Sequence, residues 1–250
     1  MKTFSIITFA LITQLSAIAQ STVSEELQQL FYQGYLTSSK APWEAAITKI
    51  NADASLSEAE RLHALTEAQS GLLVYCLAHQ DEATFDAVAD DLEENLDKIL
   101  AIDEKDARSH TLLANLYGTT VAFNNWKGMY LGPKGEKHID QALKIDSESP
   151  LAWAQRGNAR LFTPSMFGGD VDEAVACYEK AVQYHEQQSD HLTYDWRYLN
   201  ALAWLGITYQ KVGNSTAAVE TFQKALETAP RFQWVERVLL PKALSQASAQ

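Results

Sequence analysis

The sequence is poor in cysteine, proline, glycine and basic residues, and each scarcity excludes a class of protein. Two Cys in 250 residues exclude a disulfide scaffold and a Cys-rich zinc module. Only 6 Pro and 11 Gly argue against an all-β chain with many turns. The 20 Lys and Arg against 32 Asp and Glu give a formal net charge of -12, which repels phosphate backbones. Nucleic acid is therefore not expected as a partner.

Catalytic and metal-binding motifs are also missing. The 6 His form no HExxH motif and show no metal-ligand spacing with Cys, and no Ser lies in a Gly-x-Ser-x-Gly turn. The stretch from Gly128 to Gly135 lacks the Gly-Lys-Ser/Thr ending of a phosphate-binding loop. We expect no enzyme activity, no cofactor and no bound metal. Cys76 and Cys177 fall in distant predicted helices and are interpreted as buried free thiols, with a disulfide as the alternative.

The N-terminal segment has the pattern of an export signal. Lys2 precedes an apolar run from Phe4 to Ala17, and Ala17-Ile18-Ala19 is a small-residue cleavage site. We predict that residues 1–19 are a cleaved signal peptide, with cleavage near Ala19-Gln20. The mature protein would then be periplasmic or secreted. No later segment reaches transmembrane length, so no membrane span is expected.

The dominant periodicity of the rest of the chain is helical, with apolar residues three and four apart. Ser57 with Glu60, and Asp170 with Glu173, have the form of capping boxes at helix starts. The pattern predicts helices over 24–36, 42–51, 57–79, 83–101, 106–124, 135–146, 150–161, 171–187, 192–212, 215–228 and 232–246.

Segment 200–230 has small and apolar residues at a characteristic spacing: Leu205, Gly206, Tyr209, Gly213, Ala218, Phe222, Ala225 and Pro230. This spacing closely resembles the signature of a tetratricopeptide repeat (TPR). Gly206 and Ala218 would let two helices approach closely, while Phe222 fills the space beside them. Weaker copies lie upstream in phase, for example with Gly157 and Tyr178 in the preceding unit.

We therefore predict an all-α, TPR-like α-solenoid of about five helix pairs with a C-terminal capping helix. The predicted divisions after the signal peptide are a divergent helical region (20–105), TPR repeats with two inter-helix insertions (106–230) and a capping helix with a tail (231–250).

An insertion between two predicted helices points to a smaller group of TPR proteins. It reads Thr163-Pro164-Ser165-Met166-Phe167-Gly168-Gly169-Asp170. It is similar to an insertion in exported bacterial TPR proteins, among them T components of TRAP-type solute transporters. The resemblance implies a binding or scaffolding protein without catalytic activity.

Two stretches between paired helices, 123–134 and 162–169, are expected to emerge side by side at one edge of the solenoid. They carry Phe123, Trp126, Met129, Tyr130, Phe162, Met166 and Phe167. Aromatic and Met side chains are typical anchors of recognition surfaces. In the alternative interpretation these side chains fold back as a small satellite core.

The concave face is the second candidate surface. The first helices of the pairs would place there Arg108, Thr111, Asn115, Ala154, Asn158, Leu161, Ala203, Ile207 and Gln210. Asn115 and Asn158 occupy equivalent places, and their amides could hydrogen-bond the backbone of an extended peptide. The alternative is a pair of solvated amides on a polar helix face.

Arg156 and Arg160 depart from the repeat pattern, because they stand where the last repeat has Leu and Tyr. A guanidinium there must be paired, and the expected partners are Asp170, Asp172 or Glu173. The alternative is that both Arg side chains bind an anionic ligand beside Asn158.

Two functions remain open at this point. The first is an exported scaffold that binds a protein or peptide through the concave face and the loops 123–134 and 162–169. The second is an accessory protein of a TRAP-type uptake system that binds a small organic anion. The negative charge is concentrated in segment 81–106, which has eleven acidic residues and two basic ones and is interpreted as a solvated face.

Overall fold

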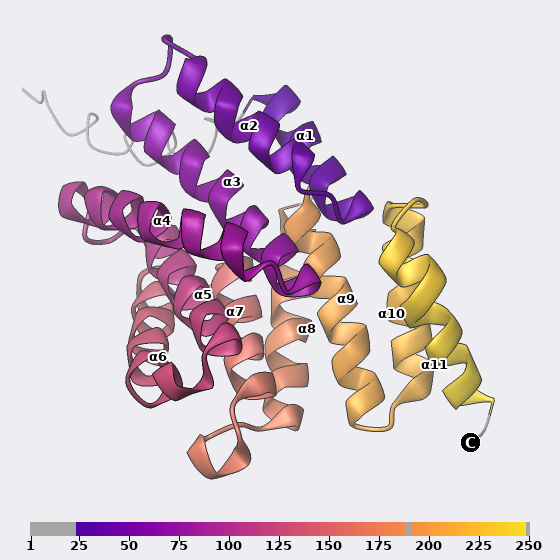
Figure 1. Ribbon diagram of the computed structural model, residues 1–250. Coiled ribbons are helices and arrows are strands. Elements are labelled where there is room, and N and C mark those ends of the chain that lie inside the picture. Colours follow the sequence, from indigo (N-terminus) through magenta and orange to yellow (C-terminus); the bar gives the residue numbers. More distant parts are fainter. Residues whose placement is uncertain (1–23, 189–191, 249–250) are drawn as a thin grey trace, which may run out of the picture.

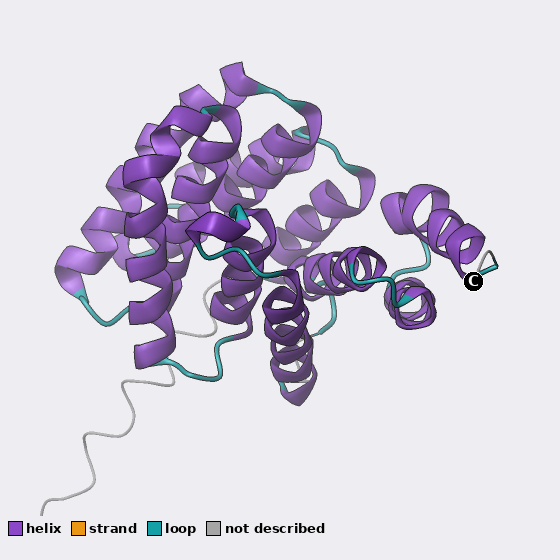
Figure 2. Ribbon diagram, turned by 90° about the horizontal axis from the view of Figure 1, so that it is seen from below, coloured by secondary structure: helices purple, strands orange, loops and turns teal. Residues whose placement is uncertain are grey.

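The computed structural model describes residues 24–188 and 192–248, and within these ranges it consists of helices and loops (Figure 2). The predicted signal peptide lies outside the described residues. The α-helices are α1 (Glu25–Thr37), α2 (Ala41–Ala52), α3 (Glu58–His79), α4 (Glu82–Ile102), α5 (Ala107–Phe123), α6 (Gly128–Ile145), α7 (Pro150–Phe162), α8 (Val171–Gln187), α9 (Trp196–Lys211), α10 (Ser215–Thr228) and α11 (Leu240–Ala247). Short 3-10 helices, η2 (Asn125–Lys127) and η3 (Ser165–Phe167), and a π-helical turn, η5 (Val235–Leu239), complete the chain.

These helices pack as an all-α, TPR-like solenoid, as predicted. Hairpins α3/α4, α5/α6, α7/α8 and α9/α10 follow one another, and α11 packs on α10 (Figure 1). In the last hairpin a Cβ on Gly206 would lie 2.3 Å from the Phe222 ring, and in the preceding one a Cβ on Gly157 would lie 2.9 Å from the Tyr178 ring. Both rings are fully buried. The close approach expected at the repeat glycine is therefore confirmed in two successive units.

One of the two predicted capping boxes is present, and both cysteines are free as predicted. Ser57 and Glu60 form the predicted capping box. Asp170 accepts a hydrogen bond from the Glu173 backbone N–H, but the Glu173 side chain turns to Arg160 instead of closing the box. Cys76 and Cys177 are free and buried, and burial raises the pKa of each thiol to about 11.

The sixth helix begins seven residues earlier than the sequence pattern indicated. The stretch expected as a loop, 123–134, shortens to Asn124 and η2, and α6 continues through Pro133. Leu131, Gly135 and Ile139 are buried at four-residue spacing, so one stripe facing α5 holds the first turns in the helix. This packing outweighs the hydrogen bond that Pro133 cannot donate.

The terminal segment is also divided differently from the single helix expected over 232–246. A π-helical turn precedes α11, and Pro241 stands in the first turn of α11. A proline ring clashes with the carbonyl four residues earlier in a regular helix, and the wider turn relieves this clash.

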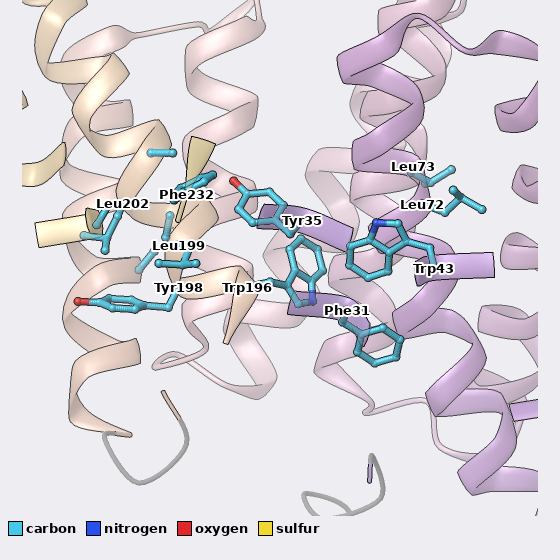
Figure 3. Close-up of a cluster of buried hydrophobic side chains, with 14 of the residues drawn as sticks. Phe31, Tyr35, Trp43, Leu72, Leu73, Trp196, Tyr198, Leu199, Leu202 and Phe232 are labelled. Atoms are coloured by element: carbon cyan, nitrogen blue, oxygen red, sulfur yellow. The ribbon is translucent and has the colours of Figure 1, made fainter. Parts of the chain in front are cut away.

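The N-terminal helices fold back onto the C-terminal half. Helix α1 contacts both α3 and α9. The ring centroids of Trp43 and Trp196 lie 5.3 Å apart, and those of Tyr35 and Phe232 also lie 5.3 Å apart (Figure 3). The Tyr35 hydroxyl accepts a hydrogen bond of 3.1 Å from Asn200 Nδ2. All four rings are buried. This aromatic cluster joins α1 and α2 to α9, so the first and last helix pairs of the solenoid contact each other.

Among the described residues, no helix has both the length and the apolar character that crossing a membrane requires.

Candidate functional site

The structure brings Asn115 and Asn158 together on the inner face, as the repeat register predicted. Both side-chain amides donate to one oxygen, Gln155 Oε1, at 3.3 and 3.0 Å. The Tyr178 hydroxyl donates to Asn158 Oδ1 at 2.5 Å. The two Asn are thus partners of a protein network, not solvated amides.

This network borders a cavity at which the inner helices meet. Its lining comes from α3, α5, α7, α8 and α9: Ser70, Val74, Leu112, Asn115, Leu151, Ala154, Gln155, Asn158, His185, Trp196, Arg197 and Asn200. The cavity measures about 40 Å³, which is room for a few water molecules. Ligand pockets are about tenfold larger. The expectation of an open groove for an extended peptide is therefore not met at these residues.

A buried carboxylate, Glu67 on α3, organises the wall of this cavity. Its Oε1 accepts hydrogen bonds from Trp196 Nε1 at 3.0 Å and Arg197 Nε at 2.9 Å, and its Oε2 accepts one from Arg197 Nη2 at 2.6 Å. Arg108 also pairs with Glu67 Oε2. Arg108, which lies on α5 and was expected to face a ligand, thus stabilises the contact between α3 and α5, while Arg197 joins α3 to α9. The role of Glu67 was not predicted, because one acidic residue in a helix gives no sign of the partners that bury it.

Arg156 and Arg160 connect three helices. Arg156 Nη1 lies 2.6 Å from Glu136 Oε2 and its Nη2 pairs with Asp140, both on α6. Arg160 Nη1 lies 2.8 Å from Glu136 Oε1, and its Nε lies 2.9 Å from Glu173 Oε2 on α8. Of the expected partners only Glu173 is confirmed; the α6 carboxylates were missed. Both guanidinium groups are therefore already paired with carboxylates, whereas the anion-binding alternative required them to be free.

The aromatic and Met side chains of the two inter-helix connections are largely exposed. We call them the apolar edge: Trp126 (89% exposed), Met129 (85%), Tyr130 (54%), Phe162 (60%), Met166 (80%) and Phe167 (72%). Both connections lie at the lower end of the molecule in Figure 1. Phe123 instead packs on the core, with its ring 4.8 Å from Phe85. The alternative of a satellite core is therefore wrong for five of these side chains, whereas the Phe162 ring packs edge-to-face on Trp204, with centroids 5.2 Å apart.

The backbone beneath Met166 and Phe167 is tightly fixed. The N–H groups of Phe167 and Gly169 both donate to the Pro164 carbonyl, at 2.8 and 3.2 Å. Asp170 N–H donates to the Arg160 carbonyl at 2.9 Å. A Cβ on Gly169 would lie 1.7 Å from the Thr163 carbonyl oxygen, so no other residue fits there without a backbone shift. The loop thus presents two exposed apolar side chains on an ordered turn.

No metal-binding cluster of three or more His, Cys, Asp or Glu side chains is present in the two described ranges. His110 and His138 form a pair, with their Nδ1 atoms 2.9 Å apart and His110 Nε2 lying 3.1 Å from the Glu104 carbonyl oxygen. Their ring centroids are 5.1 Å apart, the separation of rings that point at each other through an N–H···N bond.

Comparison with known proteins identifies the class. Residues 199–232 match the sequence model of the tetratricopeptide repeat, and the fold around them is a TPR-like solenoid.

Solved structures of other proteins share this fold. The HusA haemophore from Porphyromonas gingivalis has a TM-score of 0.61 at 16% identity, over 76% of this chain and 94% of that one. TTC0263, a thermophilic TPR protein of Thermus thermophilus, has a TM-score of 0.56 at 19% identity, over 88% of this chain and 97% of that one. No curated protein sequence matches the chain.

Proposed function

We propose that this protein is a non-enzymatic, exported scaffold that binds a protein or peptide partner through the apolar edge. The observation that carries the proposal is the exposure of Trp126, Met129, Met166 and Phe167 on helix ends and on a fixed turn. Large exposed apolar surfaces on soluble proteins mark interaction sites. The concave face is left out of the proposal, because its cavity is about 40 Å³.

The rigidity of the edge strengthens the proposal. Arg160 ties α7 to Glu136 and Glu173 on the neighbouring helices, directly before the loop that carries Met166 and Phe167. An anchor that is already ordered loses little conformational entropy on binding, so more of its burial free energy contributes to affinity.

A photocrosslinking experiment tests this function. Benzoylphenylalanine replaces Trp126 or Phe167, and cells that produce the protein from its own gene are irradiated. Both positions should yield an adduct of the same molecular mass, and Trp126→Ala should reduce the adduct formed at position 167. The matched control is position 102, because Ile102 is 72% exposed like Phe167 but lies at the end of α4. Equal adducts at all three positions, or none at either edge position, would contradict the proposal.

A second candidate is a planar apolar ligand such as haem. The fold shared with a haemophore motivates it, together with the two exposed thioethers, Met129 and Met166, among aromatic rings. A Met sulfur is one of the axial ligands that haem iron accepts. Titration with haemin should then give a saturable shift of the Soret band that Met129→Leu with Met166→Leu removes. An unsaturable change, or one that the double variant retains, would rule this ligand out at the edge.

A further inference from the structure

A furrow runs between α2 and α4. Both helices pack on α3, which supplies Leu72 at the base of the furrow. The walls are Glu44, Ile47 and Thr48 from α2 and Ala83, Thr84, Ala87 and Val88 from α4. Its volume is about 460 Å³, within the range of ligand-binding clefts.

A side chain bridges the two helices at one end of the furrow. Lys40, at the start of α2, reaches across to α4, where its Nζ lies 3.3 Å from Thr84 Oγ1 and 3.9 Å from Asp81 Oδ2. The two helices therefore run in the same direction from this bridge. The lined part covers five residues of α2, about 8 Å at the rise of an α-helix. This length accepts two side chains of a partner helix that are one turn apart.

The negative charge beside the furrow indicates that a partner would carry positive charge. Asp90 and Asp91 follow Ala87 by three and four residues on α4, just beyond the lined part; both are exposed and form no ion pair with any described residue. Lys40, the basic residue that bridges the two helices, is already paired with Glu44 at 3.6 Å and with Asp81. Segment 81–106 as a whole has eleven acidic residues and two basic ones. An apolar furrow beside uncompensated carboxylates complements a cationic amphipathic helix.

We propose that the α2/α4 furrow is a second docking surface, and that it binds a basic amphipathic helix of a protein or peptide partner. Two apolar side chains one turn apart enter between Ile47 and Ala87, and Lys or Arg side chains beside them meet Asp90 and Asp91. The small Ala83 and Ala87 side chains leave the space that the partner fills. This surface is separate from the apolar edge and does not depend on it.

The test measures fluorescence anisotropy of a labelled synthetic peptide of leucine and lysine with its leucines at helical spacing. Ala87→Trp should fill the furrow and weaken binding about tenfold or more, because it excludes at least one buried apolar side chain. Ala176→Trp is the matched control, since Ala176 is an exposed alanine on α8. The Asp90→Asn/Asp91→Asn variant should weaken binding about two- to fivefold and reduce its salt dependence.

A second peptide separates docking from attraction between opposite charges. It keeps every lysine and replaces the leucines with serine, and it should bind at least about tenfold more weakly than the first. Equal binding of the two peptides, or equal affinity of wild type and Ala87→Trp, would overturn the proposal. Trp126→Ala should leave the affinity unchanged; a loss there would place the peptide at the apolar edge and overturn the assignment to the furrow.

Discussion

Single residues on the inner face determine how the repeats are joined. Glu67 is only 5% exposed and receives hydrogen bonds from Trp196 and Arg197, far along the chain. Burial lowers the pKa of Arg197 to about 10, with Asp195 opposing the shift, so the guanidinium stays charged at neutral pH. An ion pair of this kind holds its helices in one register, because neither charge can be left without the other.

Removal of Glu67 should be costly. Glu67→Ala leaves Arg197 buried without its carboxylate, and we expect a loss of about 3–5 kcal/mol in the free energy of unfolding. Urea denaturation followed by circular dichroism measures it. Glu104→Ala, which removes an exposed carboxylate, should cost less than about 0.5 kcal/mol. Similar midpoints for the two variants would show that the Glu67 cluster contributes little.

The His110–His138 pair predicts how stability depends on pH. Burial, and then the nearby His110 and Lys137, lower the pKa of His138 below 6.5, while Asp97 opposes them. The unfolded chain therefore takes up a proton that the folded chain resists. The stabilisation is complete above about pH 6.5 and is lost as the pH falls through the folded-state pKa. Melting temperature measured against pH should fall more steeply below neutrality for wild type than for His138→Asn, and parallel curves would disprove this linkage.

Within a single helix, local sequence signals and tertiary packing can favour different boundaries. Where they agree, the sequence pattern predicts the helix ends correctly. The helices with an uninterrupted apolar stripe, such as α8 and α10, begin and end where the pattern and the caps indicate. The first turns of α6 were missed, because Gly132 and Pro133 signal a loop unless the burial of Leu131 against α5 is known. Among the candidate site residues, the register of Asn115 and Asn158 could be predicted, but their shared partner Gln155 could not.

The turn that carries Met166 and Phe167 gives a prediction at the level of this element. Gly169→Ala should displace the turn, because the new Cβ would lie 1.7 Å from the Thr163 carbonyl oxygen. Crosslinking from position 167 should therefore fall, while crosslinking from position 126, on the other connection, should change little. Gly132→Ala is the control, since nothing lies within 4 Å of a Cβ there. Unchanged crosslinking from both positions in Gly169→Ala would show that the shape of the turn is immaterial.

The molecule as a whole is more closed than its repeat pattern suggests. Sequence periodicity describes contacts between neighbouring helices, and those were predicted. It carries no information on superhelical curvature, which decides whether α1 meets α9. The aromatic residues of that contact, Tyr35, Trp43 and Trp196, were not singled out from the sequence, because they lie on three separate helices.

The contact between α1, α2 and α9 should make the stability of the N-terminal helices depend on α9. Trp196→Ala removes a buried ring that contacts Tyr35 and Trp43, at an expected cost of about 3–5 kcal/mol. Hydrogen exchange should show faster amide exchange in α1 and α2 as well as in α9. Phe222→Ala, a buried ring between α9 and α10, should act mainly on those two helices. Exchange in α1 that is equal in both variants would mean that the contact between the ends does not stabilise the N-terminal helices.

The hydrogen bond between Asn200 and Tyr35 also has a consequence for biosynthesis. The two residues are 165 positions apart, so the first helices leave the ribosome well before the helix that completes their packing has been made. Contacts of this sequence separation slow folding, because a long loop must close before they form. Phe31, Tyr35 and Trp43 thus stay incompletely covered during synthesis, and a chaperone has access to them in this interval.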